Sequence, residues 1–283
     1  MFKVKSWSLQ FTPFSSQQRN TNSCLITNAI PKSGTYFINK IAECLDKWED
    51  TKVQINFDFW YTITPQGDVG VFKCLLPFSV KKLRNGQLAA AHLPWSENLE
   101  QVIENVTTTR RIKHVFLYRD PRDALVSYMR FVTYSSIYTR TPEARAKKNF
   151  FQNNFANDDD RLTYLIQERM DNYSVKYDFL KYEPWLRSPH SCAIKFEELY
   201  SELLEIKENG FGNIFKKLFN YLEVDISAID PVNFYNSVHE NSLTASGEKK
   251  KISQYKRYFK DEHYKMLDNA DFRKILDVFR YEW

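Results

Sequence analysis

The sequence predicts a single α/β domain with a central parallel sheet flanked by helices. Two segments carry this prediction, Cys24 to Leu45 and Ile112 to Phe131, because each reads as a buried strand, a tight turn and an amphipathic helix. Their separation fits successive strands of one parallel sheet. The 283 residues, 43% of them hydrophobic, supply enough core material for one large domain. We expect residues 1–22 to form an N-terminal arm and residues 23–283 to form the domain.

The first segment contains a turn that suits an anion. An apolar run from Leu25 to Ile30 leads into Pro31-Lys32-Ser33-Gly34-Thr35, and a helical pattern follows. The first amides of a helix have no internal partners, and the helix dipole adds partial positive charge there. Gly34 lets the backbone close on an anion, and Lys32 supplies a full charge. This is not the common nucleotide loop, Gly-x-x-x-x-Gly-Lys-Ser/Thr, because proline precedes the lysine.

The second segment places a cation directly after a strand. Ile112 to Tyr118 reads as a buried strand, and Arg119 follows it. Asp120 is expected to be the N-cap of the next helix, with Asp123 at the acid position of a capping box. Ser127 lies about two turns into that helix, near the face of the cap. An arginine fork and a hydroxyl that converge on one edge suit a phosphate dianion.

A histidine is expected at the end of a further strand. The segment Gln87 to Pro94 reads QLAAAHLP, in which a run of small apolar residues suggests a strand end that Pro94 stops. His92 is then at the carboxyl end of a strand, where open α/β sheets bind their ligands. A lone histidine is more often structural than catalytic, so its position carries the functional interpretation.

These three segments together resemble the sulfotransferases that use 3′-phosphoadenosine-5′-phosphosulfate (PAPS). Residues 31–35 match the start of the family loop Pro-Lys-Ser-Gly-Thr-Thr-Trp, and Tyr36 and Phe37 depart from it. Residues 119–127 match the family's 3′-phosphate motif, Arg-Asn/Asp-Pro-Arg/Lys-Asp-x-x-Val-Ser. Residues 90–94 resemble Lys-Thr-His-Leu-Pro, with alanine in place of the family's lysine at position 90. The resemblance implies the P-loop-like sulfotransferase fold.

Two later segments resemble the same family more weakly. Phe196-Glu-Glu-Leu199 is similar to the family's Tyr-Glu-Asp-Leu. The tail at 247–259 is similar to Arg-Lys-Gly-x-x-Gly-Asp-Trp-Lys, a lid that closes on the 3′-phosphate. It keeps the basic charge and the aromatic-lysine pair Tyr255-Lys256 but lacks both motif glycines, so its geometry is expected to differ. The family's dimerisation motif is not recognisable, which leaves monomer and homodimer as alternatives.

The resemblance implies a set of site residues. His92 is implied as the general base, and Lys32 as the cation that stabilises the leaving phosphate. No metal is expected, because lysine and helix amides suffice for a sulfuryl group with one negative charge. PAPS is the implied co-substrate and adenosine 3′,5′-bisphosphate (PAP) the product. The implied nucleotide-binding residues are Lys32, Ser33, Gly34, Thr35, Tyr36, Phe37, Arg119, Ser127, Phe196, Lys249, Lys250 and Lys251. The implied acceptor-binding residues are Phe57, Phe59, Trp60, Tyr61 and His92.

Composition and charge narrow the possible partners and compartment. A net charge of +5 without a basic block favours small anionic ligands over nucleic acid. The sequence shows neither a signal peptide nor an apolar run of membrane-spanning length, so we expect no membrane partner. The four cysteines lack metal-binding spacing and indicate reduced residues of a cytoplasmic protein: Cys24, Cys44, Cys74 and Cys192.

Two other functional classes stay open at this point, a P-loop kinase that uses Mg-ATP and a catalytically inactive binding module. The acceptor of a sulfotransferase cannot be read from the motifs, and its hydroxyl, amine or guanidinium groups are all alternatives. The glycine-poor composition, rich in Lys, Asn, Phe and Tyr, favours a bacterial natural product such as a saxitoxin-type alkaloid. Residues 134–161 are expected to form a mobile polar surface segment with some helix. The acidic triplet Asp158–Asp160 within it is expected to be solvated, with binding of a cationic acceptor as the alternative.

Overall fold

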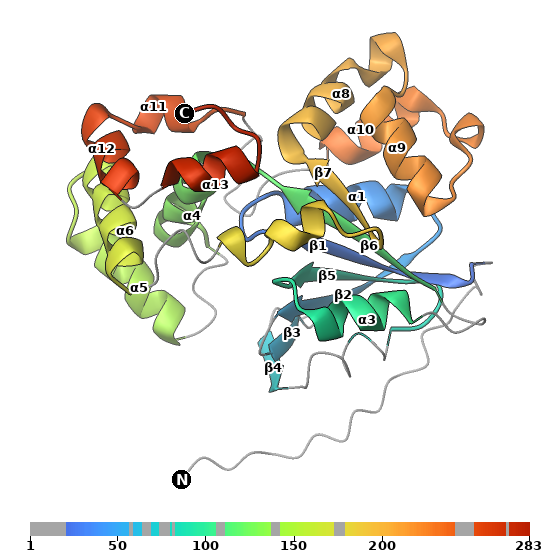
Figure 1. The fold of residues 1–283 in the computed structure, drawn as a ribbon, viewed down its shortest axis with the longest axis horizontal. Helices are drawn as coiled ribbons and strands as arrows, with labels where there is room; N and C mark the ends of the chain where they lie inside the picture. Colours follow the sequence, from blue (N-terminus) through green and yellow to red (C-terminus); the bar gives the residue numbers. More distant parts are fainter. Residues whose placement is uncertain are drawn as a thin grey trace.

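The structure is a computed structural model that describes residues 21–56, 59–63, 69–73, 80, 83–105, 111–136, 142–172, 179–240, 252–269 and 272–283. These residues form one α/β domain in which helices cover both faces of a sheet, as the sequence predicts (Figure 1). The strands of the sheet follow the order β4-β3-β2-β5-β1-β6-β7. The expected arm, residues 1–22, lies almost wholly outside the described residues.

Five strands form the parallel part of the sheet. Every residue of the first strand along the chain is buried, because it lies between two parallel neighbours and has helices on both faces. The parallel strands, in their order across the sheet, are β2 (Glu49–Asn56), β5 (Gln87–His92), β1 (Ser23–Ala29), β6 (Arg111–Tyr118) and β7 (Ser191–Lys195).

One edge of the sheet is antiparallel, which the sequence analysis does not anticipate. Strand β3 (Phe59–Ile63) pairs antiparallel with β2, and β4 (Val69–Lys73) pairs antiparallel with β3. The connection between β3 and β4, residues 64–68, is too short for a parallel crossover. The central sheet is therefore parallel only from β2 to β7.

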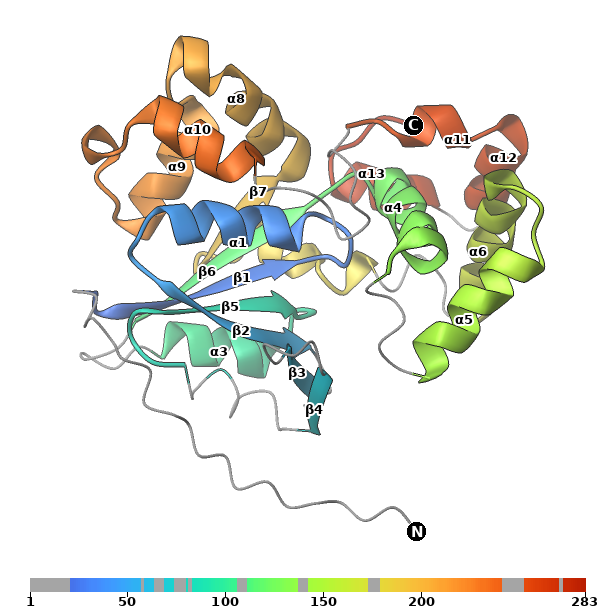
Figure 2. The ribbon, with the colours of Figure 1, turned by 180° about the vertical axis from the view of Figure 1, so that it is seen from behind.

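The helices form two hydrophobic cores, one on each face of the sheet. The views from both sides agree that one group of helices packs above the sheet and that α3 lies below it (Figures 1 and 2). The upper group is α1 (Thr35–Cys44), α8 (Phe196–Asn209), α9 (Asn213–Leu222) and α10 (Pro231–Glu240), and α3 spans Glu97–Glu104.

A second helical layer gathers beyond the carboxyl ends of the parallel strands (Figure 2). Its members come from the middle and the end of the chain, so this layer brings distant segments together at the edge where ligands bind in open α/β sheets. They are α4 (Pro121–Tyr134), α5 (Pro142–Asn153), α6 (Asp158–Asn172), α11 (Tyr255–Tyr258), α12 (Asp261–Asn269) and α13 (Phe272–Val278). Two 3₁₀ turns, Glu183–Leu186 and Ile226–Ala228, complete the described elements.

Helices α5 and α6 occupy much of the predicted polar segment 134–161. Phe151 is fully buried, so α5 is anchored in the core. Asp158 pairs with Arg161 at 2.9 Å, and Asp159 pairs with Lys260 at 2.6 Å. The expectation that the acidic triplet is simply solvated is therefore wrong for these two carboxylates, which hold protein cations.

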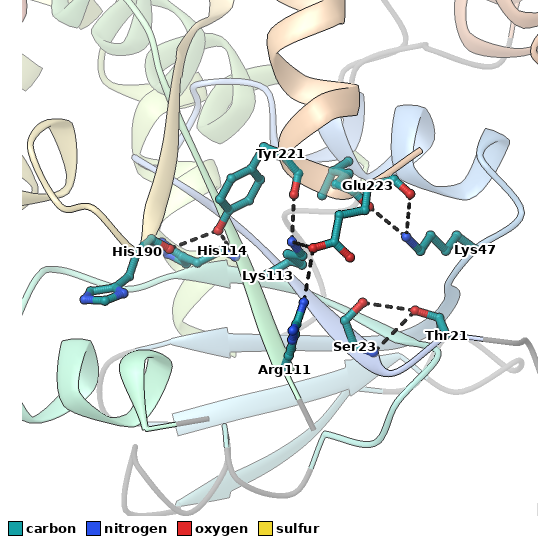
Figure 3. A network of polar contacts seen from close by, with 10 residues as sticks. Thr21, Ser23, Lys47, Arg111, Lys113, His114, His190, Tyr221 and Glu223 are labelled. Atoms are coloured by element: carbon teal, nitrogen blue, oxygen red, sulfur yellow. Dashed lines mark hydrogen bonds and ion pairs between the residues drawn. The ribbon is translucent and has the colours of Figure 1, made fainter. Parts of the chain in front are cut away.

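A network of polar contacts closes the opposite, amino-terminal edge of the sheet (Figure 3). Lys113 Nζ donates to the carbonyl of Tyr221 at 2.9 Å and to Glu223 Oε1 at 2.7 Å. Lys47 Nζ donates to the carbonyls of Leu222 and Glu223 at 2.8 and 2.9 Å. These lysines satisfy the last carbonyls of α9, so the polar residues at this edge of the sheet have a structural role.

Two further expectations concern the cysteines and the membrane. Cys24 and Cys192 are buried and Cys44 is partly exposed, and all three are free thiols. Cys74 lies outside the described residues. Within the described chain, no helix has both the length and the apolar character that crossing a bilayer requires.

Candidate active site

The three residues singled out from the sequence, Lys32, His92 and Arg119, lie at the ends of three neighbouring strands. Strands β5, β1 and β6 are adjacent and parallel, so the loops that follow them leave the same edge of the sheet. The Ile30 amide donates to the Leu117 carbonyl at 3.3 Å, which ties the loop after β1 to the end of β6. The loops carrying Lys32, His92 and Arg119 therefore start side by side.

The loop after β1 is a tight turn that opens a helix. Its centre is closed by a bond from the Ser33 amide to the Ile30 carbonyl at 2.9 Å. Lys32 and Gly34 both have left-handed backbone conformations, with φ of 72° and 103°. A Cβ added at Gly34 would lie 2.8 Å from the Phe196 ring, so only glycine fits here. No side chain caps the N-terminus of α1, which leaves this end of the helix suited to an anion.

Ser33 and Lys32 add polar groups to this turn. The Ser33 hydroxyl is fully buried and has no hydrogen-bond partner among the described residues. The Lys32 ammonium lies 3.6 Å from the centroid of the Phe131 ring on α4. Burial, and then the nearby positive charge of Arg119, lower the pKa of Lys32 to about 7. An anionic ligand would give the buried Ser33 hydroxyl a hydrogen-bond acceptor and would favour the protonated form of Lys32.

His92 is the last residue of β5, as predicted. Its Nδ1 lies 2.7 Å from the Ala29 carbonyl, and because a carbonyl only accepts, Nδ1 carries the hydrogen in the neutral ring. Nε2 is then left with its lone pair. Burial lowers the pKa of His92 to about 4, opposed by the bond to Ala29 and assisted by the Lys32 charge. The imidazole is thus neutral around pH 7, and its Nε2 lone pair is free to accept a proton.

The backbone that follows His92 is fixed from two directions. The Asn28 side chain donates to the Leu93 carbonyl at 2.9 Å and accepts from the Leu93 amide at 2.7 Å. The Trp185 indole also donates to the Leu93 carbonyl, at 2.9 Å. These buried bonds hold the imidazole at the sheet edge, and the sequence motifs gave no sign of Asn28 or Trp185.

The start of α4 shows which part of the capping prediction holds. Asp120 is the N-cap, and its carboxylate accepts from the Arg122 amide at 2.9 Å and forms a buried pair with the Arg122 side chain. The capping-box role of Asp123 is wrong, because the Asp120 amide donates to Glu197 at 3.0 Å instead. Glu197, on a helix 77 residues further along the chain, has taken that position.

Asp123 connects Arg119 to the end of the chain. Its carboxylate accepts from Arg119 Nη2 at 3.1 Å and from the backbone amides of Ser253 and Tyr255 at 2.9 and 2.8 Å. The Arg119 guanidinium also lies 4.8 Å from the centroid of the Phe196 ring. The predicted 3′-phosphate motif and the C-terminal segment therefore share one buried carboxylate.

The model of the sulfotransferase domain family matches residues 23–271, which is most of the chain. The chain belongs to the sulfotransferase family. Among solved structures it is similar to mouse sulfotransferase SULT7A1 complexed with PAP, with 13% sequence identity and a TM-score of 0.47. That match covers 90% of this chain and 84% of the mouse chain. A search of curated protein sequences finds no significant match.

The residues expected to bind the nucleotide of this sulfotransferase differ from one another in their exposure to solvent. Tyr36 is 57% exposed, and Thr35 and Ser127 are partly exposed. Phe37 and Phe196 are buried, and their rings meet edge to face at 5.7 Å. A fully buried ring offers no face to adenine, so stacking by Phe37 does not fit this structure. Phe196 instead packs beneath Gly34 and Arg119 and supports the loop.

The structure tests none of the remaining predicted site residues of the sulfotransferase. Lys249, Lys250, Lys251 and Phe57 lie outside the described residues. Phe59, Trp60 and Tyr61 belong to β3, which is separated from β5 by β2, and only their backbone is described. Their proposed roles stay predictions.

A cavity of ≈ 220 Å³ lies beside the sulfotransferase turn. Lys32 and Pro94, two residues after His92, line it together with Leu125 and Tyr128 of α4. The segment that precedes the Glu183–Leu186 turn contributes Phe179, Lys181 and Tyr182. The sequence analysis missed this segment, because it carries no motif and reaches the site only through the tertiary fold.

Proposed function

We propose that this sulfotransferase moves the sulfuryl group of PAPS to a hydroxyl of a small-molecule acceptor, and that His92 is the base. One observation carries the proposal: Lys32, His92 and Arg119 lie at or just after the ends of three adjacent strands and influence one another's charge. Arg119 lowers the pKa of Lys32, and Lys32 lowers the pKa of His92. A base, a cation for the leaving group and a cation for a second phosphate are the groups that this transfer requires.

The features of the first turn fit a 5′-phosphosulfate. The uncapped start of α1 offers backbone amides, the buried Ser33 hydroxyl lacks a partner, and Gly34 leaves no room for a side chain. Arg119, just before α4, and Ser127, within it, are the proposed ligands of the 3′-phosphate. Contributions from Thr35, Tyr36 and the lysines at 249–251 are part of the proposal as predictions.

The chemistry of the proposed step balances without a metal. The acceptor oxygen forms a bond to sulfur while the bond from sulfur to the 5′-phosphate oxygen breaks, and the electron pair stays on that phosphate. His92 Nε2 takes the acceptor proton, a role that typically contributes roughly 10²–10⁴ in rate. Lys32 stabilises the charge that develops on the phosphate, and a charge-assisted contact of this kind is worth about 1.5–3 kcal/mol. Positioning and charge stabilisation dominate such loose transfers.

Nucleotide binding tests the donor. Thermal denaturation with PAP in EDTA is expected to show stabilisation, with less from adenosine 5′-monophosphate, because Arg119 has no 3′-phosphate to bind. Arg119→Gln is expected to reduce the preference for PAP over the monophosphate. Lys216→Gln is the control, since Lys216 is exposed on α9 and faces solvent. Stabilisation by ATP with Mg²⁺ alone would refute the donor assignment and favour the kinase.

The base is tested separately from binding. His92→Ala is expected to lower the turnover of PAPS with any accepted hydroxyl compound by about 10²-fold or more and to leave PAP affinity within about twofold. Unchanged turnover would remove His92 from the reaction. If the wild-type protein binds PAP but transfers sulfate to no acceptor, the chain is a binding module. A cytoplasmic location, no nucleic-acid or membrane partner, and a monomer or homodimer remain predictions.

A further inference from the structure

The cavity beside Lys32 has an unusual combination of lining groups. Ile30, Pro31, Pro94 and Leu125 are apolar lining residues, and Tyr128, Phe179 and Tyr182 are aromatic ones. The only charged side chains among its described lining residues are those of Lys32 and Lys181. Its volume of ≈ 220 Å³ exceeds the roughly 150 Å³ cavity that holds benzene, so a molecule of one or two rings fits.

Lys181 is presented to this cavity by a fixed turn. The Trp95 amide donates to the Lys181 carbonyl at 2.9 Å, and the Tyr182 amide donates to the Phe179 carbonyl at 3.0 Å. Phe179 and Tyr182 on either side are buried. The Tyr182 ring stacks on Phe116 of β6 at 6.1 Å with an interplanar angle of 5°. Lys181 is both a lining residue of the cavity and exposed to solvent, and no ion pair of its ammonium is found among the described residues.

The carboxylates gathered at the start of α4, the helix that contributes Leu125 and Tyr128 to the cavity, are already engaged. Asp120 is paired with Arg122 at 2.8 Å, and Asp123 with Arg119 at 3.1 Å. Glu197 accepts from the Asp120 amide and from the Tyr281 hydroxyl at 3.0 and 2.8 Å. A cationic acceptor would thus meet two ammonium groups and no available carboxylate from these elements, whereas an anionic one would gain from the same field.

We propose that the acceptor is a one- or two-ring aromatic hydroxyl compound with an anionic substituent, and that Lys181 selects for this charge. The ring lies against Tyr128, Phe179 and Tyr182, the hydroxyl is directed to Lys32 and His92, and the anionic group pairs with Lys181. This inference rests on the proposed function and uses the same transfer step. It argues against the guanidinium alkaloid suggested by composition alone.

Three phenols of equal length that differ in charge test the proposal. They are 4-hydroxyphenylacetate, 4-hydroxyphenylacetamide and tyramine, which carry a negative, a neutral and a positive side group. With PAPS as donor, kcat/KM is expected to be at least about fivefold higher for the acetate than for the amide, and lower again for tyramine. Equal values for all three, or a preference for tyramine, would overturn the proposal.

Lys181 variants assign any such preference to this residue. Lys181→Gln is expected to bring the ratio of acetate to amide close to one, and Lys181→Arg is expected to keep it. Lys216→Gln removes an exposed lysine on α9 that does not line the cavity, and it is expected to leave the ratio unchanged. A ratio that survives Lys181→Gln would contradict the role of Lys181.

A binding measurement separates failure of this inference from failure of the proposed function. In the presence of saturating PAP, 4-hydroxyphenylacetate is expected to raise the melting temperature of the wild-type protein and tyramine is not. If PAP stabilises the protein but the acetate neither binds nor reacts, the acceptor class is wrong and the donor assignment stands. If PAP itself does not stabilise the protein, the proposed function fails first.

Discussion

The Asp123 carboxylate accepts a hydrogen bond from the backbone amide of Tyr255 at 2.8 Å, although 132 residues separate them in the sequence. The same carboxylate holds the Arg119 guanidinium, and the Arg122 guanidinium lies 4.0 Å from the centroid of the Tyr255 ring. Desolvation raises the pKa of Asp123, opposed by the Arg119 charge. The start of α4 and the C-terminal segment are thus one unit.

Replacement of Asp123 by asparagine is expected to weaken this unit. The substitution removes the charge and one acceptor oxygen, so Arg119 and two backbone amides compete for the oxygen that remains. A buried hydrogen bond to a charged group contributes about 1.5–3 kcal/mol, and the free energy of unfolding should fall by a similar amount. PAP affinity should fall as well, because Arg119 loses its orientation. Urea unfolding and calorimetric titration with PAP measure the two effects.

Asp277→Asn provides the matched control for that substitution, since Asp277 is exposed on α13. It should change neither unfolding nor PAP affinity. An Asp123→Asn variant with wild-type stability and wild-type PAP affinity would show that the three bonds contribute nothing to this unit.

Replacement of Gly34 by alanine is expected to deform the turn that carries Lys32. The left-handed backbone at Gly34 costs an L-residue about 1–2 kcal/mol. The new methyl group also collides with the Phe196 ring, which adds about 1–3 kcal/mol. The prediction is that Gly34→Ala lowers the free energy of unfolding, measured in urea, by about 2–5 kcal/mol.

A second change tests whether the collision is the cause. Phe196→Leu in the Gly34→Ala background should recover part of the lost stability, because the smaller side chain makes room for the methyl group. A Gly34→Ala variant with wild-type stability, or no recovery in the double variant, would contradict this account of the turn.

Short-range patterns account for what the sequence predicted well. The apolar run into β1, Asp120 as the N-cap of α4 and His92 at the end of β5 each depend on a few neighbouring residues. Lys32 and Arg119 lie on loops that follow neighbouring parallel strands, as expected, but these strands are not successive along the chain, because β2, β3, β4 and β5 come between them.

Long-range contacts account for what the sequence missed. Nothing near Asp123 in the sequence indicates that its partners are Ser253 and Tyr255, and the local capping-box pattern pointed to the wrong donor. Phe37 occupies the position of the family's tryptophan, yet the fold packs its ring against Phe196. Lys181 lies in no motif, and only the tertiary fold brings it to the cavity.

The lowered pKa of Lys32 predicts a pH dependence of nucleotide binding. With a pKa of about 7 in the free protein, Lys32 loses its charge as the pH rises through this value. PAP affinity should therefore fall several-fold between about pH 6 and pH 9, where an ordinary lysine would stay protonated. Lys32→Arg should remove the fall over this range, because arginine does not titrate there. Titration calorimetry across this range gives the affinities, and a flat wild-type profile would contradict the assignment.

Fully buried His114 predicts an acid-dependent loss of stability. The residue lies beside the network of Figure 3, and its Nδ1 is 3.0 Å from Ser191 Oγ. The centroid of its ring lies 4.3 Å from that of Trp185. Its Nε2 has no hydrogen-bond partner among the described residues. Burial lowers the pKa of His114 to about 3, so between about pH 6.5 and pH 3 only the unfolded chain binds this proton. The stability is complete above pH 6.5 and falls with the pH, by about 2 kcal/mol at pH 5 from this residue. The free energy of unfolding is measured in urea for the wild type and for His114→Gln at pH 7 and pH 5. On acidification, the variant should lose about 2 kcal/mol less of this free energy than the wild type. An identical loss in both proteins would show that another group titrates.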